Sequence, residues 1–289
     1  MSKKRHIILI PVYNDQKSLN KLLIKIDSHL DPVTNLRTEI LILDDKSTYR
    51  INIDNKKFKN LEKISILTVK KNLGSQKIIA VGLNYLKKIK ENFFITVMDS
   101  DGEDNPVEIE KMLELALKNV DHVITSNRKG RNDSLLIRFL YKLHLLITFF
   151  FSFKWISFGN FTTFNSKNIE RILSDTSSWL AYSSSVIKNC KIKRVYARRD
   201  KRYFDKSKLS LLKLAEHSIR VNAVFAKRVL ISSAVYISFI YFIFGLGNLF
   251  FLISLGIIFF NLLIFLIRIK HLIKNYKICD NIIENYKSF

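Results

Sequence analysis

A long run without any charged residue or histidine, residues 229–267, constrains this chain more than any other feature. One helical crossing of a bilayer needs roughly 20 apolar residues, so the run is long enough for two crossings. Residues that favour turns lie near its middle: Gly245, Gly247 and Asn248. The run predicts a transmembrane hairpin of two helices, at about 229–244 and 249–267. A buried helical hairpin in a soluble core is the alternative, although so long an uncharged run is unusual in soluble chains.

Basic residues flank the hairpin at both ends, while its turn carries no charge. They are Lys227 and Arg228 before it, and Arg268, Lys270, His271 and Lys274 after it. Because basic residues concentrate on the cytoplasmic side of membrane proteins, we expect a multi-pass membrane protein with both termini in the cytoplasm. The opening residues do not read as a secretory signal, since their apolar run is short and meets Pro11 and Asn14 at once.

The charge balance indicates an anionic partner. The chain has 48 Lys and Arg against 25 Asp and Glu, a formal net charge of +23. Nucleic acid or an anionic membrane surface would fit such a charge. The sequence has no nucleic-acid recognition motif and no aromatic and basic single-strand platform, so we expect a membrane and no nucleic acid. Cys190 and Cys279 are far apart and form no CxxC, which gives a zinc site or disulfide framework no support.

The residues before the hairpin alternate between strand and helix patterns. Continuous β-branched runs predict strands at 6–12, 39–44, 64–69, 93–98 and 120–125, and amphipathic patterns predict helices at 16–30, 75–90 and 107–118. Such alternation predicts an α/β domain, a Rossmann-like and mostly parallel sheet with helices on both faces. We assign this domain to residues 1–210, an amphipathic linker helix to 211–228 and a polar cytosolic tail to 268–289.

Polar residues follow each of the first four predicted strands. They are Tyr13, Asn14 and Asp15, then Asp44 and Asp45, then Lys71 and Asn72, then Asp99 and Asp101. Ligands of open α/β sheets bind beyond the carboxyl ends of the strands, so these loops predict a nucleotide pocket. Asp99 and Asp101 offer the hard oxygen ligands with which Mg²⁺ or Mn²⁺ bridges a protein to phosphates. The alternative is a solvated turn and N-cap before a helix that starts near Pro106.

Residues 134–153 are strongly apolar, yet Arg138, Lys142 and His144 interrupt them at helical spacing. The uninterrupted part after His144 is too short to span a bilayer. A basic stripe opposite an aromatic face suits an amphipathic helix in the headgroup region, and we predict such an interfacial helix. An ordinary core helix stays open as the alternative.

Six segments occur in an order that resembles family 2 glycosyltransferases of the GT-A fold. They are IPVYND (10–15), LILDDKS (41–47), KKNLGSQKIIAVGL (70–83), MDSDGEDNP (98–106), NRKGRNDSLLIRFLY (127–141) and RRDKRYFDKSKLS (198–210). Within that family the chain most resembles the polyprenyl-phosphate sugar transferases related to dolichol-phosphate mannose synthase. The resemblance spans about residues 8–214, and a C-terminal membrane hairpin is also found in many members.

The resemblance implies an inverting transfer of a sugar from a nucleotide-sugar to a polyprenyl phosphate, undecaprenyl or dolichyl, at the cytoplasmic membrane face. It implies that the nucleoside is lined by Pro11, Tyr13, Asp15, Asp45 and Gln76. It implies that Asp99 and Asp101 hold Mg²⁺ or Mn²⁺ on the diphosphate. It assigns the clamping of the diphosphate or the lipid phosphate to Arg128, Arg131, Arg199, Arg202 and Lys208. A homo-oligomer is compatible with it.

The chain departs from the family pattern at four places. Asp15 stands where the family usually has Glu, and Gly-Glu-Asp-Asn follows Asp101 in place of Leu-Gln-x-Pro. The segment SFGNFTTFN lacks the expected acidic and arginine residues, and Asp205 replaces a common glycine before Ser207 and Lys208. Three other functions stay open: transfer to a cell-surface glycan or another lipid acceptor, a non-catalytic membrane scaffold, and a nucleic-acid binder suggested by charge alone.

Overall fold

The computed structural model of the chain describes residues 4–30, 36–54, 57–129, 135–198, 200–204, 210–273 and 275–289. Within these ranges, the side chains of residues 128, 129 and 198 are not described.

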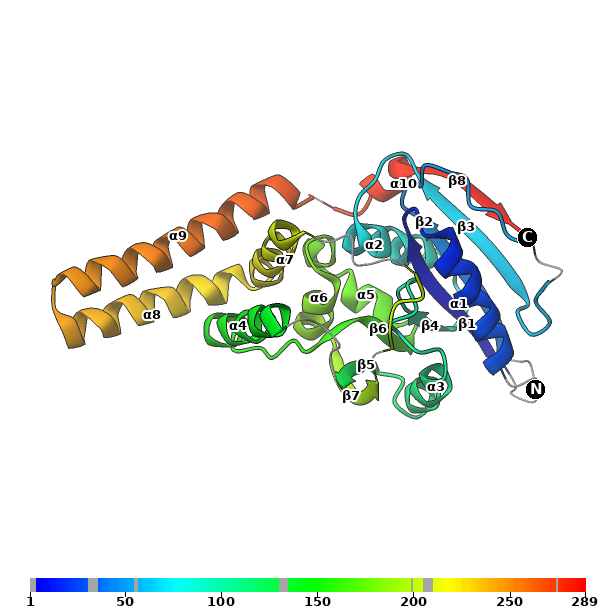
Figure 1. Ribbon diagram of the computed structural model, residues 1–289, viewed down its shortest axis with the longest axis horizontal. Coiled ribbons are helices and arrows are strands. Elements are labelled where there is room, and N and C mark those ends of the chain that lie inside the picture. The colour runs from blue at the N-terminus through cyan, green and yellow to red at the C-terminus, as the bar shows by residue number, and fades with distance from the viewer. Residues whose placement is uncertain are drawn as a thin grey trace.

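A mixed sheet of eight strands forms the centre of the globular domain (Figure 1). The strands are β1 (Lys4–Val12), β2 (Leu36–Asp44), β3 (Lys63–Val69), β4 (Phe94–Val97), β5 (His122–Lys129), β6 (Phe158–Asn165), β7 (Lys191–Arg198) and β8 (Ile283–Ser288). Their spatial order is β7-β5-β6-β4-β1-β2-β3-β8. Four pairings are parallel: β1 with β2, β1 with β4, β2 with β3, and β5 with β7. The three pairings of β6 and β8 are antiparallel. The predicted α/β fold with a mostly parallel sheet is therefore confirmed.

Helices cover both faces of this sheet, because its central strands are apolar on both sides. The last seven residues of β1 and of β2 are all buried. One face packs on α2 (Ser75–Leu86), α5 (Asn168–Ile172) and α6 (Tyr182–Asn189), and the other on α1 (Gln16–His29) and α3 (Glu108–Lys118). Leu9 and Leu43 point to the first face, whereas Ile10 and Ile42 point to the second. Alternate side chains of one strand thus fill two separate cores.

The residues after the hairpin belong to the globular domain, which corrects the prediction of a polar tail at 268–289. The short helix α10 (Ile278–Ile282) buries Cys279 completely in the core on the α2 face. Strand β8 then adds antiparallel to β3, and the Phe289 amide donates to the Ile64 carbonyl at 2.9 Å. The physical reason is that β3 has an open edge, which the last strand covers.

Two long helices at the predicted hairpin positions project from the domain as an antiparallel pair (Figure 1). They are α8 (Ala226–Phe244) and α9 (Asn248–His271), and the lead-in helix is α7 (Leu211–Ala223). Both are long and apolar enough to cross a membrane. Their large apolar side chains are mostly exposed, with Phe242 at 86%. An apolar surface of this size needs a partner, and lipid is the partner that fits two such helices.

The hairpin returns the chain to the side from which it left. Helix α7 before it and β8 after it both pack into the same domain. At the base, Arg268 donates from Nη1 to the Ala223 carbonyl at 2.8 Å, and further out Asn261 donates to Ser233 Oγ at 2.7 Å. Both ends of the hairpin therefore lie on one side of any membrane that it crosses.

Helix α4 (Leu135–Ser152) lies beside the base of the hairpin (Figure 1). Ser232 of α8 donates to the Phe151 carbonyl at 3.0 Å, and the rings of Phe151 and Phe260 lie 5.0 Å apart. Most apolar side chains of α4 are exposed, including Phe139 at 63%. This exposure contradicts the core-helix alternative. By length and composition α4 is also a candidate membrane span, and its interfacial placement stays a prediction.

Candidate active site

The polar loops after β1 and β2 meet at the carboxyl edge of the sheet. Val12 pairs with Asp44 in the parallel register, and the Asp45 amide donates to the Val12 carbonyl at 2.9 Å. The Asn14 amide donates to Ser47 Oγ at 3.0 Å, with Asn14 in the left-handed region at φ 51°. The convergence expected from strand order is thus present in the structure.

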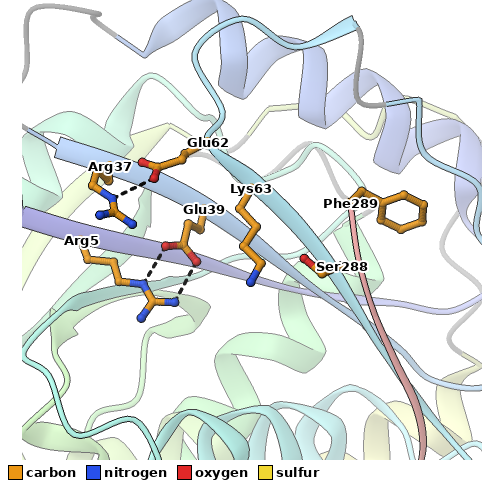
Figure 2. Close-up of a pocket in the computed structure, with 7 residues that line it drawn as sticks. All are labelled: Arg5, Arg37, Glu39, Glu62, Lys63, Ser288 and Phe289. Atoms are coloured by element: carbon orange, nitrogen blue, oxygen red, sulfur yellow. Dashed lines mark hydrogen bonds and ion pairs between the residues drawn. The ribbon is translucent and has the colours of Figure 1, made fainter.

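A cavity of about 440 Å³ opens at the opposite edge, near the amino ends of the strands (Figure 2). Its lining residues are Arg5, Arg37, Glu39, Glu62, Lys63, Ser288 and Phe289. Arg5 makes a bidentate pair with Glu39, and Arg37 pairs with Glu62 at 2.9 Å (Figure 2). These charges already neutralise one another, and nucleotides bind at the other edge of such sheets. We therefore place the candidate site at the loops and not in this cavity.

Asp45 fixes the turn that begins α2. Its buried carboxylate accepts hydrogen bonds from the amides of Leu73, at 2.7 Å, and Gly74, at 2.8 Å. Gly74 has φ 86°, a backbone conformation that favours glycine. Burial raises the pKa of Asp45 to about 6, although the two amide bonds act in the opposite direction.

The other residues predicted to line a nucleoside differ in exposure. Pro11 is buried in β1, Tyr13 is 47% exposed, and Asp15 lies half-buried at the start of α1. Tyr13 is therefore accessible from solvent at this edge of the sheet, whereas Pro11 is not.

Gln76 is buried, and the protein itself engages its side-chain amide. Gln76 Nε2 donates to Asn160 Oδ1 at 3.1 Å, and the Tyr182 amide donates to Gln76 Oε1 at 2.7 Å. Gln76 therefore ties α2 to β6 and α6. In this structure it acts as a positioning residue for the site.

Asn160 is a site residue that the sequence did not reveal. It lies on β6 and donates from Nδ2 to Asp99 Oδ1 at 2.8 Å, while its own Oδ1 accepts from Gln76. One side chain thereby joins the acidic loop to the start of α2. The signal in the sequence was one asparagine in SFGNFTTFN, a segment that mixes polar and aromatic residues, and such a residue is too common to single out.

Asp101 forms an ion pair with Arg202, with Oδ2 and Nη1 3.1 Å apart. Its Oδ1 accepts from the Glu103 amide at 3.0 Å, and its carbonyl accepts from the Tyr203 amide at 2.9 Å. Gly102 has φ +85°, and a Cβ there would lie 2.4 Å from the Tyr203 ring. The segment 200–204 therefore packs directly on the acidic loop. The fold thus brings together two motifs that lie about 100 residues apart in the chain, 98–106 and 198–210.

Other predicted cations cannot be placed. Arg128 lies at the end of β5, where its side chain is outside the described residues. Arg131, Arg199 and Lys208 also lie outside the described residues.

Asp99 and Asp101 fit a divalent cation by their chemistry. Both supply hard carboxylate oxygens, and both are partly buried. Among the described residues, no group of three or more His, Cys, Asp or Glu side chains is arranged to hold a metal ion. Two carboxylates suit Mg²⁺ or Mn²⁺ when substrate phosphates and water complete the coordination.

The Glycosyl transferase family 2 model matches residues 7–190, from β1 to the end of α6. The chain belongs to Glycosyl transferase family 2. The resemblance of the first five motifs, which lie within the matched residues, to this family is thereby confirmed. The sixth motif, at 198–210, lies beyond the matched residues.

A curated relative is undecaprenyl-phosphate 4-deoxy-4-formamido-L-arabinose transferase of Edwardsiella ictaluri (strain 93-146). It is 28% identical over 129 residues, which cover 44% of this chain and 38% of that protein. The match thus spans less than two fifths of the relative's length.

Solved structures share the fold at low sequence identity. Glucosyl-3-phosphoglycerate synthase from Mycobacterium tuberculosis, with Mn²⁺, UDP-glucose and phosphoglyceric acid, superposes with a TM-score of 0.51 at 12% identity, covering 78% of this chain and 80% of that one. The same enzyme with Mn²⁺, UDP and phosphoglyceric acid gives 0.50 at 13% identity, covering 78% of each chain. These likenesses show the GT-A-like fold.

Replacing Asn160 by alanine is expected to lower the rate of sugar transfer roughly 10- to 100-fold. This is the usual effect of removing a hydrogen-bond partner that orients a carboxylate ligand of a metal ion. The Asp99 carboxylate would lose its 2.8 Å donor and part of its orientation. Initial rates and Mn²⁺ affinity of the purified membrane enzyme measure this. Asn165→Ala, on the same strand, serves as the control, since Asn165 caps the following turn by accepting from the Lys167 amide. Equal losses in both variants would assign Asn160 to strand stability alone.

Asp45 predicts a pH dependence of stability. The pKa of Asp45 is about 6 in the folded chain against 3.8 as its ordinary value. Between about pH 4 and 6, the folded chain keeps a proton that the unfolded chain has lost, so the free energy of unfolding falls as pH rises, by about 3 kcal/mol in total. Melting curves of the wild type and Asp45→Asn from pH 4 to 7 measure this. Parallel curves for the two proteins would contradict the assignment.

Proposed function

We propose that the chain is an inverting, metal-dependent glycosyltransferase that moves a sugar from a nucleotide-sugar to a polyprenyl phosphate at the cytoplasmic face of a membrane. The observation that carries this proposal is the seating of Arg202 on the acidic loop of Asp99 and Asp101, in a family 2 chain whose domain leads directly into an apolar hairpin.

Donor binding is assigned to the loops at the carboxyl edge. The exposed ring of Tyr13 suits stacking on the base, and Asp45 holds the turn before α2 in place. Asp99 and Asp101 would hold Mg²⁺ or Mn²⁺ on the diphosphate of the donor. When bound, the cation supplies Lewis-acid stabilisation of the charge that develops on the leaving diphosphate.

Arg202 would add its guanidinium to the same diphosphate, because arginine suits bidentate contacts with phosphate oxygens. The acceptor is already ionised near neutral pH, so its phosphate oxygen attacks the anomeric carbon without a strong general base. The bond from sugar to diphosphate breaks, and its electron pair leaves with the nucleoside diphosphate. The configuration at the anomeric carbon inverts in this single displacement.

A lipid acceptor is supported by two observations. The hairpin begins and ends in the domain that carries the site, and a curated relative acts on undecaprenyl phosphate by its name. The basic residues Lys227, Arg228, Arg268 and Lys270 near the base of the hairpin favour the cytoplasmic side.

The experiment is transfer of radiolabelled sugar in membranes that contain the chain, with a panel of nucleotide-sugars as donors and polyprenyl phosphate as acceptor. We expect a polyprenyl-phosphate sugar that forms with Mn²⁺ or Mg²⁺ and not with EDTA. Product on a glycan or another lipid, with none on polyprenyl phosphate, would move the enzyme to a different acceptor class. Folded protein that transfers no sugar from any donor would overturn the proposal.

A further inference from the structure

Cations from separate segments gather where the hairpin meets the globular domain. They are Lys71 after β3, Lys77 in the first turn of α2, Arg220 on α7 and Lys270 near the end of α9. Two carboxylates interact with Lys77: Glu216 of α7, which also lies 3.2 Å from His271 Nε2, and Asp45 after β2. Four positive side chains thus face two carboxylates in this group. We call the four cations the basal cation cluster.

The contacts of this cluster hold two of its cations in fixed places. Lys77 Nζ lies 3.2 Å from His271 Nδ1 and 5.7 Å from the centroid of the Trp179 ring. Arg220 Nη2 donates to the Trp179 carbonyl at 3.1 Å. The buried Arg220 Nε has no hydrogen-bond partner among the described residues. A guanidinium N–H of this kind is a donor still to be satisfied.

The electrostatics of the cluster indicate a missing anion. Burial lowers the pKa of Lys77, and its cationic neighbours, Arg220 first, lower it further. Half-buried like charges without equal countercharge are held together against repulsion. A phosphate monoester would relieve that repulsion and accept from several of these donors at once.

The cluster lies between the donor loops and the membrane helices. Lys77 directly follows Gln76, and the Gly74 amide that starts its helix is held by Asp45. Arg220 and Lys270 come from the helix that leads into the hairpin and from the helix that leaves it. A ligand bound here therefore touches both the catalytic domain and the base of the hairpin.

We propose that the basal cation cluster binds the phosphate of the lipid acceptor, with Lys77 and Arg220 as its main ligands. This assignment rests on the proposed function and gives the acceptor phosphate residues separate from Asp99, Asp101 and Arg202. It also gives the hairpin a role in recognition, since Lys270 comes from the end of α9.

The test is binding of farnesyl phosphate, a short polyprenyl phosphate, to the full chain in nanodiscs of neutral phosphatidylcholine. Lys77→Met keeps the apolar stem and removes the charge, and Arg220→Met does the same on α7. Each is expected to weaken farnesyl phosphate binding roughly tenfold or more, as loss of a charged hydrogen bond does. Lys77→Arg should retain most of the affinity. Lys118→Met, at the exposed end of α3, is the matched control and should change nothing.

Two further ligands, farnesol and phosphatidylglycerol, test whether the cluster recognises a phosphate monoester rather than an isoprenoid chain or any anionic lipid. Farnesol lacks the phosphate, and phosphatidylglycerol carries a phosphodiester, so both should bind at least about tenfold more weakly if the cluster recognises a monoester. Equal competition by phosphatidylglycerol would reduce the cluster to a general anionic-surface contact and overturn the proposal. UDP affinity should stay within about twofold in Arg220→Met, because Arg220 lies on α7, outside the donor loops.

A purely structural role of Lys77 predicts that Lys77→Met lowers the melting temperature of the ligand-free protein and leaves farnesyl phosphate affinity unchanged. The proposal predicts the opposite: the melting temperature stays unchanged or rises, since one of four repelling cations is removed, and the affinity falls. A lower melting temperature, or unchanged farnesyl phosphate affinity, would overturn the proposal. Binding is measured without a sugar donor, so a wild-type chain that binds farnesyl phosphate but transfers no sugar refutes the proposed function alone.

Discussion

Replacing Asp101 by asparagine is expected to lower the rate of sugar transfer roughly a thousandfold, the scale of losing a main source of transition-state charge stabilisation. Asparagine keeps the Oδ1 that accepts from the Glu103 amide at 3.0 Å, so the loop should keep its shape. It removes the negative charge that pairs with Arg202 and that would hold a divalent cation. Initial rates with saturating donor and Mn²⁺, together with Mn²⁺ binding followed by electron paramagnetic resonance, measure both effects.

The matched control is Glu110→Gln on α3, an exposed carboxylate in the helix that follows the acidic loop. It should leave rate and Mn²⁺ affinity within about twofold, because exposed carboxylates contribute little. Suppose that Asp101→Asn binds Mn²⁺ as the wild type does and transfers sugar at more than about a tenth of the wild-type rate. The loop would then be a solvated turn and helix N-cap rather than a metal site.

Ending the chain after residue 274 is expected to destabilise the globular domain by about 5 kcal/mol, although the hairpin itself stays whole. The deletion removes the buried side chains of Cys279 and Ile282 and exposes the edge of β3 that β8 covers. It also removes the Tyr276 hydroxyl, which donates to the Asp175 carbonyl at 2.9 Å. For a domain of this size, the melting temperature should fall by roughly 10–20 °C.

Glu284→Ala is the control for that deletion. Glu284 lies on β8 in an exposed ion pair with Lys46, so its loss should cost less than about 1 kcal/mol. Melting of the purified enzyme in detergent, followed by circular dichroism, gives both values. A truncated chain that melts within about 2 °C of the wild type would mean that α10 and β8 add nothing to the fold.

Local patterns predicted most of the amino-terminal half of the fold correctly. The strands at 6–12, 39–44 and 64–69 and the helix at 16–30 match β1, β2, β3 and α1 to within a few residues. These segments are strongly apolar and periodic, so their structure follows from local sequence. No element was predicted between 158 and 198, where the strands mix threonine, asparagine, lysine and arginine with apolar residues.

The site was predictable in its position but not in its contacts. Asp99 and Asp101 follow β4, and the rule that ligands bind beyond the carboxyl ends of parallel strands places them. The role of Gln76 was predicted as a nucleoside contact, whereas its amide is occupied by Asn160 and the Tyr182 backbone. Such pairings join residues 84 and 106 positions apart, and no local pattern encodes them.

The sequence by itself determined the alternation of strands and helices, the polar loops after the strands, and the uncharged run that becomes α8 and α9, because each depends on residues close together in the chain. Only the tertiary structure decided that Asn160 orients Asp99, that Arg202 sits on Asp101, and that the last residues close the sheet as β8. The physical reason is that sheet edges and buried polar groups take whatever partner the fold brings to them, and a short, mostly exposed strand such as β8 has no apolar period that would announce it.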